Sequence, residues 1–286
     1  GSKMFIEVGN RVRIEDILRG IIVQSGNDAS IALAEALSGT EGAFAEKMNE
    51  TALDLGMTDT QFRNSTGWPD PEHYTTAYDL ALLAQRLIAD FPEYYHYYSE
   101  TEFTWNEIRQ GNRNPLLYRP GLGADGLKTG HTEAAGYGLT ASAKRGDQRL
   151  ITVINGLDSV RARGTEAEKI LEWGFRNFEN RTLFKAGDTV EEAGVWLGVD
   201  ETVPLVTKEA VRLTLPRSGN ADVKAVVRYD GPLPAPIAEG APVATLTVSA
   251  PDLNPIEIPL YAARDVEKLG FMGRILAAAR TLVFGA

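Results

Sequence analysis

Three short stretches of the sequence combine residue types that can bind an anion or relay a proton. In the first, VQSGNDAS, Ser25 and Asn27 flank a glycine, so both side chains can point the same way from a tight turn between two helices. The alternative is that Ser25 or Asn27 simply caps a helix end, the commoner role of these residues at such a place. Taken alone, the stretch favours the capping role.

The second stretch is DGLKTGHTEAAGY, where Lys128, Thr129 and Gly130 open a predicted strand and His131 follows. A glycine in a strand allows close approach of another backbone, so an extended ligand can pair with this strand as an added strand. The ammonium and the hydroxyl together suit a carboxylate. The alternative is an ordinary edge strand with a solvated lysine.

The third stretch is SVRARGTEAEK, in which Arg161 and Arg163 precede the last predicted helix of this region. Arginine suits bidentate recognition of a carboxylate better than lysine does. The alternative, favoured for each arginine taken singly, is a surface residue paired with Glu166 or Glu168. Each of the three signals is weak alone, and their order along the chain strengthens them jointly.

The composition limits the classes of function. The chain has 286 residues, 43% apolar and 24% charged, which is normal for a soluble protein with one large or two ordinary domains. A net charge of −10 argues against a nucleic-acid partner. There is no cysteine, which excludes disulfides and thiolate metal sites, and His73, His96 and His131 show no ligand spacing, which argues against a zinc hydrolase. No motif implies a cofactor or a metal.

Local patterns predict a mixed first region over residues 14–180. Apolar residues recur at helical spacing in 15–24, 43–57 and 166–178, and another helix is predicted to begin near Thr76, where TAYD fits a capping box. The runs 137–145 and 148–156 read as an antiparallel hairpin around a turn at Gly146 and Asp147.

From about residue 182 the pattern changes to short strands and turns. Apolar and polar residues alternate in 211–215 and 244–248, and a Pro-rich connection lies between them. We therefore predict three parts: a mixed domain of helices and strands over 1–181, a β-sandwich-like domain over 182–266 and an amphipathic helix over 267–286.

The predicted terminal helix gathers its apolar side chains on about half of its circumference. They are Leu269, Phe271, Met272, Ile275, Leu276, Ala279, Leu282 and Val283. Arg274 and Arg280 flank that arc, while Gly270, Gly273 and Thr281 lie behind it. A helix packed on a protein core would look similar. The terminal position and the cationic flanks favour a peripheral membrane contact.

The order of S-G-N and K-T-G resembles the penicillin-recognising serine hydrolases, whose elements are S-x-x-K, S-x-N and K-T-G. The sequence is most similar to the low-molecular-mass penicillin-binding proteins, the D-alanyl-D-alanine carboxypeptidases. RGIIVQSGNDAS, NSTGWPDPEHYTTAYDLALLA, DGLKTGHTEAAGY and EWGFRNF carry the resemblance, which runs from about Lys3 to the end. It implies an α+β catalytic domain of helices around an antiparallel sheet, then a small β domain and an amphipathic helix.

The resemblance also implies a reaction and the residues that perform it. A serine attacks the peptide bond between the terminal D-alanines of a peptidoglycan stem peptide, and β-lactams acylate the same serine. Ser25 would relay a proton to the leaving group, and Asn27 would hold the substrate's amide. Lys128 would supply positive potential, and Thr129 and Arg163 would bind the terminal carboxylate.

Two further expectations follow from the resemblance. Gly130 lies in the K-T-G stretch that the substrate pairs with, and the backbone N–H of His131 would form half of the oxyanion hole. The protein is expected on the periplasmic side of the bacterial cytoplasmic membrane, anchored peripherally by its last helix.

The sequence departs from the family in one respect: no serine has a lysine three positions later. Ser142 and Lys144 are two apart, which is the wrong spacing. We expect the nucleophile and its general base on a companion N-terminal segment, which would also complete the central sheet. The other explanation is a catalytically dead relative, either a peptidoglycan-binding module or an adaptor at the membrane surface.

Overall fold

The computed structural model describes residues 1–218, 222–251 and 253–275. The chain divides into two compact units, Gly1–Arg176 and Asn177–Ala286. The predicted boundaries at 181/182 and 266/267 stay predictions.

The first unit combines five helices and two small sheets among its described residues. The helices are α1 (Ile14–Ile22), α2 (Asn27–Ser38), α3 (Glu41–Leu55), α4 (Ala77–Asp90) and α5 (Val160–Asn177), with 3₁₀ turns η1 (Tyr95–Ser99) and η2 (Pro115–Tyr118). The strands are β1 (Glu102–Trp105) and β2 (Ile108–Gly111), which pair, and β3 (Ala124–Thr132), β4 (Gly136–Arg145) and β5 (Gln148–Leu157), which form an antiparallel sheet in that order.

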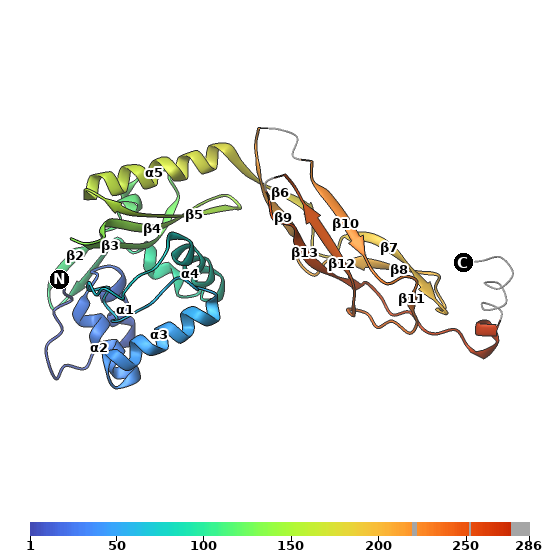
Figure 1. Ribbon diagram of the computed structural model, residues 1–286, viewed down its shortest axis with the longest axis horizontal. Coiled ribbons are helices and arrows are strands. Elements are labelled where there is room, and N and C mark those ends of the chain that lie inside the picture. Colours follow the sequence, from blue (N-terminus) through green and yellow to red (C-terminus); the bar gives the residue numbers. More distant parts are fainter. Residues whose placement is uncertain (219–221, 252, 276–286) are drawn as a thin grey trace. The chain divides into compact units, whose positions relative to one another are not determined.

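The β3-β4-β5 sheet is covered on both faces. Figure 1 shows α5 on one face and α1 to α4 on the other. Leu171 and Phe175 of α5 pack with buried Leu139 of β4, and on the other face Leu127 of β3 packs with Ala84 of α4. This arrangement confirms the predicted α+β class and the predicted β4-β5 hairpin.

The N-terminus of α4 follows the predicted capping box only in part. Thr76 is the N-cap of α4 and its hydroxyl accepts the N–H of Asp79, as predicted. The second half of the predicted capping box is wrong, because the Asp79 carboxylate instead accepts from the Asp59 N–H and the Thr60 hydroxyl. Buried Asp79 thus ties the loop before α4 to the helix.

Two predicted boundaries near the site were wrong. Lys128 does not open a strand, because β3 already begins at Ala124 and the lysine pairs with Thr140 at mid-strand. The arginines do not precede α5 but lie in its first turn, since the Ser159 hydroxyl accepts the Ala162 N–H and starts the helix early.

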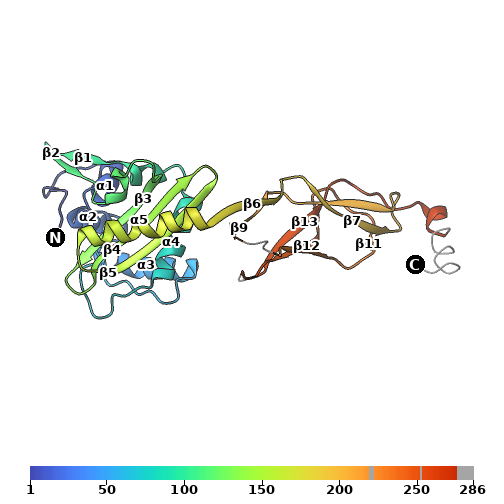
Figure 2. The same ribbon diagram turned by 90° about the horizontal axis from the view of Figure 1, so that it is seen from above.

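The described part of the second unit is built mainly of strands (Figure 2). They are β6 (Phe178–Phe184), β7 (Thr189–Trp196), β8 (Thr202–Val206), β9 (Val211–Pro216), β10 (Lys224–Arg228), β11 (Leu233–Pro234), β12 (Pro242–Ser249) and β13 (Ile256–Ala262). Six of them form a sheet in the order β10-β12-β13-β8-β7-β11, and β6 pairs with β9. Val211, Leu213 and Leu215 all point into the core, as their alternation predicts.

The end of the described chain is tied to the second unit by its backbone. The Val199 N–H donates to the Glu267 carbonyl, and the Leu269 N–H donates to the Leu197 carbonyl. One helical turn follows over residues 271–275. The remaining positions of the predicted amphipathic helix, 276–286, lie outside the described residues. No helix within the described ranges is long and apolar enough to cross a membrane.

Candidate active site

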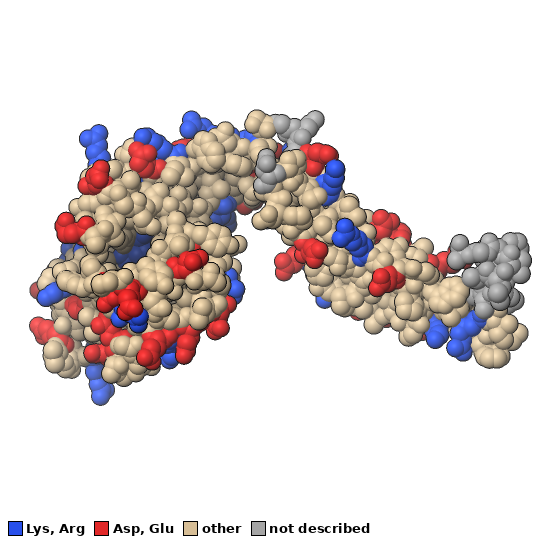
Figure 3. Space-filling view, in the orientation of Figure 1, with Lys and Arg blue, Asp and Glu red and all other residues tan. Residues whose placement is uncertain are grey.

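A cleft of about 1290 Å³ opens in the first unit, and most of the residues singled out from the sequence line it. Its walls come from the turn between α1 and α2, the loop 65–69, β3, the start of β4 and the start of α5. Ser25, Asn27, Lys128, Thr129, Gly130, His131 and Arg163 all line it. Figure 3 shows a hollow in this unit with Lys or Arg atoms visible inside it.

Ser25 lies at the turn between α1 and α2, in a backbone conformation that few non-glycine residues adopt. Its φ is 55°, in the left-handed region. The N–H of Gly26 donates to the carbonyl of Gly20, which closes the turn, and Asn27 is the first residue of α2. The N-cap is Gly26, without a side-chain cap bond, so the capping alternative for Ser25 and Asn27 is wrong.

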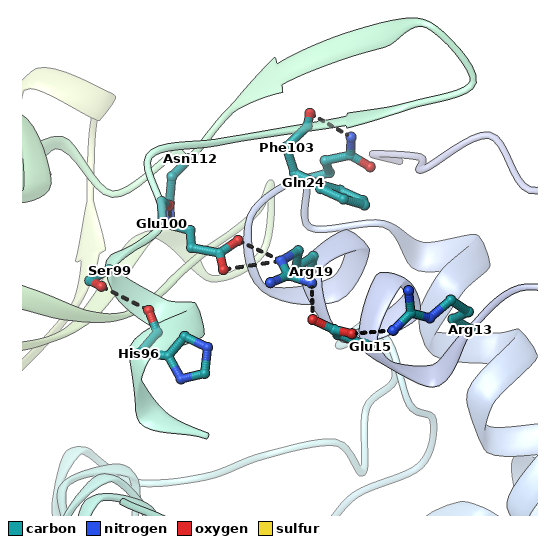
Figure 4. A network of polar contacts seen from close by, with 9 residues as sticks. All are labelled: Arg13, Glu15, Arg19, Gln24, His96, Ser99, Glu100, Phe103 and Asn112. Atoms are coloured by element: carbon teal, nitrogen blue, oxygen red, sulfur yellow. Dashed lines mark hydrogen bonds and ion pairs between the residues drawn. The ribbon is translucent and has the colours of Figure 1, made fainter. Parts of the chain in front are cut away.

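A polar network holds α1, and therefore the Ser25 turn, in place (Figure 4). The Arg19 guanidinium donates to both carboxylate oxygens of Glu100 at 2.8 and 3.0 Å and to Glu15 at 2.7 Å. The buried side chain of Gln24 donates to the Phe103 carbonyl at 3.1 Å. These bonds join the end of α1 to Glu100 and to β1. They hold the backbone that precedes Ser25 in one position.

Lys128 meets Ser25 at the floor of the cleft. Its Nζ donates to Ser25 Oγ at 2.7 Å and to the Thr129 carbonyl at 2.9 Å. Burial, followed by the positive charges of Arg113 and Arg163, lowers the pKa of Lys128 to about 8. The lysine is therefore a cation at neutral pH without an ion pair among the described residues.

Arg163 is buried although no carboxylate within the described residues pairs with it. Its guanidinium donates to the carbonyls of Gly130 at 3.3 Å and Arg113 at 3.4 Å, and its buried Nε has no partner there. Burial is the main cause that lowers the pKa of Arg163. Buried polar groups are nearly always hydrogen-bonded, so a buried guanidinium beside a cleft that is bonded only to carbonyls and leaves its Nε unpaired indicates an anion-binding position.

Thr129, Gly130 and His131 form the exposed edge of the sheet, because β3 is an edge strand. Thr129 is buried, and Gly130 lines the cleft, where a Cβ would meet nothing within 4 Å on the face of the strand. The His131 ring stacks on Tyr137 with centroids 3.8 Å apart and an angle of 7°. An extended ligand therefore has an unobstructed edge to approach at Gly130.

For Arg161 the alternative of a surface residue is right about the exposed position and wrong about the pairing, and for Arg163 it is wrong on both counts. Glu166 pairs with Lys169, and Glu168 pairs with Arg119. Arg161 is exposed and does not line the cleft, whereas Arg163 does. The two arginines are two residues apart in α5, which places them on opposite faces of the helix, one toward solvent and one toward the site.

Among the cleft residues that the sequence did not single out are Arg113, Tyr137 and Trp68. Arg113 adds a third cation, whose pKa is lowered by burial. It stands alone in a loop, so no spacing pattern reveals it. Tyr137 lies within the stretch DGLKTGHTEAAGY, and Trp68 lies within NSTGWPDPEHYTTAYDLALLA, which also carries the family resemblance. In both cases the signal in the sequence was an aromatic residue inside a family-like stretch.

Comparisons with known proteins agree with this geometry. Residues 1–159 match the family described as D-alanyl-D-alanine carboxypeptidase, and residues 178–268 match the C-terminal domain of penicillin-binding protein 5. The chain is 43% identical over 275 residues to the D-alanyl-D-alanine carboxypeptidase DacC of Escherichia coli, covering 96% of this chain and 69% of the relative. It is 36% identical over 285 residues to the D-alanyl-D-alanine carboxypeptidase DacF of Bacillus subtilis, and the match covers 95% of this chain and 71% of the relative.

A solved structure gives the same result for the fold. Penicillin-binding protein 5 from Haemophilus influenzae is 38% identical, with a TM-score of 0.83 over 94% of this chain and 78% of that one. The chain belongs to the D-alanyl-D-alanine carboxypeptidase family, the low-molecular-mass penicillin-binding proteins with serine-type hydrolase activity.

Proposed function

We propose that this cleft binds the terminal carboxylate of a peptidoglycan stem peptide and assists removal of its last D-alanine. One observation carries the proposal. Three cations, Lys128, Arg113 and Arg163, converge in the cleft, and none of them is in an ion pair within the described parts of the chain. At an effective dielectric of 20, one carboxylate at 4 Å from a cation gains about 4 kcal/mol.

The hydrogen bond between Lys128 and Ser25 supports a proton relay. An ammonium is only a donor, so the Ser25 oxygen accepts and its own proton is free to point toward the substrate. In the proposed reaction Ser25 protonates the departing amine of D-alanine and is reprotonated through Lys128. Asn27 holds the substrate's amide, Thr129 and Arg163 hold its carboxylate, and the N–H of His131 donates to the oxyanion.

The attacking serine and its general base are proposed to come from a companion N-terminal segment that carries S-x-x-K. No serine of this chain has that motif. The open cleft can receive such a segment, and β5 is the outer strand of its sheet, pairing only with β4 among the described strands. An unpaired strand edge is a place where a further strand can add.

We also propose that the protein acts on the periplasmic side of the cytoplasmic membrane and is acylated by β-lactams. Phe271, Met272 and Ile275 are exposed in the last described turn, which supports a peripheral contact through the C-terminal segment. A role in cell shape would follow from trimming stem peptides.

Intact mass under denaturing conditions, before and after incubation with a penicillin, tests the catalytic proposal. The full protein with its S-x-x-K segment should gain one penicillin mass, located on the serine of that segment. An adduct on Ser25 would contradict the assigned roles. No adduct on any species would favour a binding module that recognises the carboxylate without reacting.

A further inference from the structure

Trp68 stands at the cleft with much of its surface in water, although burial of an indole would stabilise the fold. Its side chain is 59% exposed, and it lines the cleft together with Asn27 and Ser65. An exposed large apolar side chain beside a binding site often marks a contact with a ligand. The loop that carries Trp68 fixes the position of its backbone.

The loop that carries Trp68 is built around one side chain. Asn64 Oδ1 accepts the N–H groups of Thr66 at 3.2 Å, Gly67 at 2.8 Å and Trp68 at 3.0 Å. Asn64 Nδ2 in turn donates to the Trp68 carbonyl at 2.9 Å, so Asn64 holds both backbone groups of the tryptophan. Gly67 supplies the positive φ of 76° that this turn requires.

The same loop is fixed at both ends. The Ser65 N–H and hydroxyl both donate to the carboxylate of Glu41 at the start of α3, at 3.0 and 2.7 Å. Pro69 follows Trp68 and restricts the tryptophan backbone to extended conformations. The backbone of Trp68 is therefore positioned before any ligand binds, and little ordering entropy remains to be lost there.

Trp68 also lies close to the residue proposed to hold the substrate's amide. Both side chains lie near Gly1, since a Cβ built on that glycine would be 2.5 Å from Asn27 Nδ2 and 3.4 Å from Trp68 Cζ3. A peptide held at Asn27 by its amide and at Arg163 by its carboxylate would have its preceding residue near the indole.

From this geometry we propose that Trp68 is a specificity-determining residue. Its indole packs against the aliphatic side chain of the residue that precedes the terminal D-Ala-D-Ala, and Asn64 is the positioning residue for it. The inference rests on the proposed function. It adds that the enzyme uses binding energy from a remote part of the peptide, so that longer stem peptides are favoured over the bare dipeptide.

Binding measurements on the full protein with two peptides test the inference. They are N-acetyl-D-Ala-D-Ala and the same peptide extended by an acylated L-lysine. The wild-type protein should bind the longer peptide more tightly. Trp68→Ala should weaken the longer peptide about tenfold and the shorter one less than twofold, and Trp68→Phe should keep most of the preference. Tyr78→Ala, which removes another exposed aromatic outside the cleft, should change neither.

Asn64→Ala should reproduce part of the selective loss, because the indole remains but its backbone is released. Equal weakening of both peptides by Trp68→Ala, or no weakening of either, would overturn the inference, provided that thermal unfolding shows the variant folded. If Trp68 instead packs against the companion segment, the variant will lower the stability of the full protein and affect both peptides alike. If neither peptide binds to the wild-type protein, the proposed function itself fails.

Discussion

The two units bury different kinds of side chain. Among the described residues, the second unit buries one polar side chain, Thr207, within an otherwise apolar set. The first unit buries several more, including Gln24, Thr129 and Arg163, and all three belong to the site or to its support.

The contrast shows where folding and function place opposite demands. The core of the second unit contains Leu205, Leu215, Leu246 and Leu260, each fully buried, and such packing favours stability alone. In the first unit a buried guanidinium costs stability because no acid within the described residues compensates it. The cost indicates a partner that comes from outside, which is the proposed carboxylate.

The largest effect is expected from Lys128→Met, which keeps the side-chain volume and removes the charge. Affinity for a D-Ala-D-Ala carboxylate should fall about a thousandfold, because roughly 4 kcal/mol of charge interaction is lost. Lys144→Met, on the exposed end of β4, is the matched control and should have no effect. Similar losses in both variants would show that overall charge, not the site, governs binding.

Next in size is Leu205→Ala in the second unit. Creating a cavity in that core should lower its free energy of unfolding by about 2–5 kcal/mol in a denaturant titration. Carboxylate binding by the first unit should stay unchanged under native conditions. Lost binding while the first unit remains folded would contradict the separation of stability and carboxylate binding between the two units.

A smaller change is expected from Arg163→Lys. Lysine keeps the charge but lacks the planar guanidinium, whose paired N–H groups can bind both oxygens of a carboxylate. Carboxylate affinity should therefore fall about tenfold in a calorimetric titration. Arg161→Lys lies in the same helical turn, outside the cleft, and should bind as the wild type does. An unaffected Arg163→Lys variant would mean that Arg163 contributes charge only.

The smallest effect comes from pH. Because the pKa of Lys128 is about 8, its charge is present below that pH and is lost above it. Carboxylate affinity should be level from pH 6 to 7 and fall by up to about tenfold between pH 8 and 9. The stability of the free first unit should instead rise over that range, since the unfolded lysine keeps its proton. A level affinity from pH 7 to 9 would contradict the assignment.

Local signals in the sequence predicted much of the fold. The hydroxyl of Thr76 and the alternation of 211–215 act within a few residues, so their structural effect was readable. A helix after the Ser25 turn was expected, but the extent of α2 was not predicted, because Gly26 is its N-cap and its Ala-rich sequence has little apolar periodicity. The early start of α5 depended on the single hydroxyl of Ser159.

The site was predictable only in part. The approach of Ser25 to Lys128 follows from no local pattern, and the order of motifs shared with the family indicated it. Arg113 and Trp68 lie in loops that tertiary hydrogen bonds help to hold, from Arg163 to the Arg113 carbonyl and from Ser65 to Glu41. A single arginine or tryptophan in a loop carries no periodicity from which its position could be derived.

Carboxylate recognition is the central claim, and calorimetry with two ligands tests it most directly. N-acetyl-D-Ala-D-Ala and its C-terminal amide differ only in the charge that the cations of the cleft are proposed to bind. The protein should bind the free acid at least tenfold more tightly than the amide. Equal affinities for the two would contradict the account.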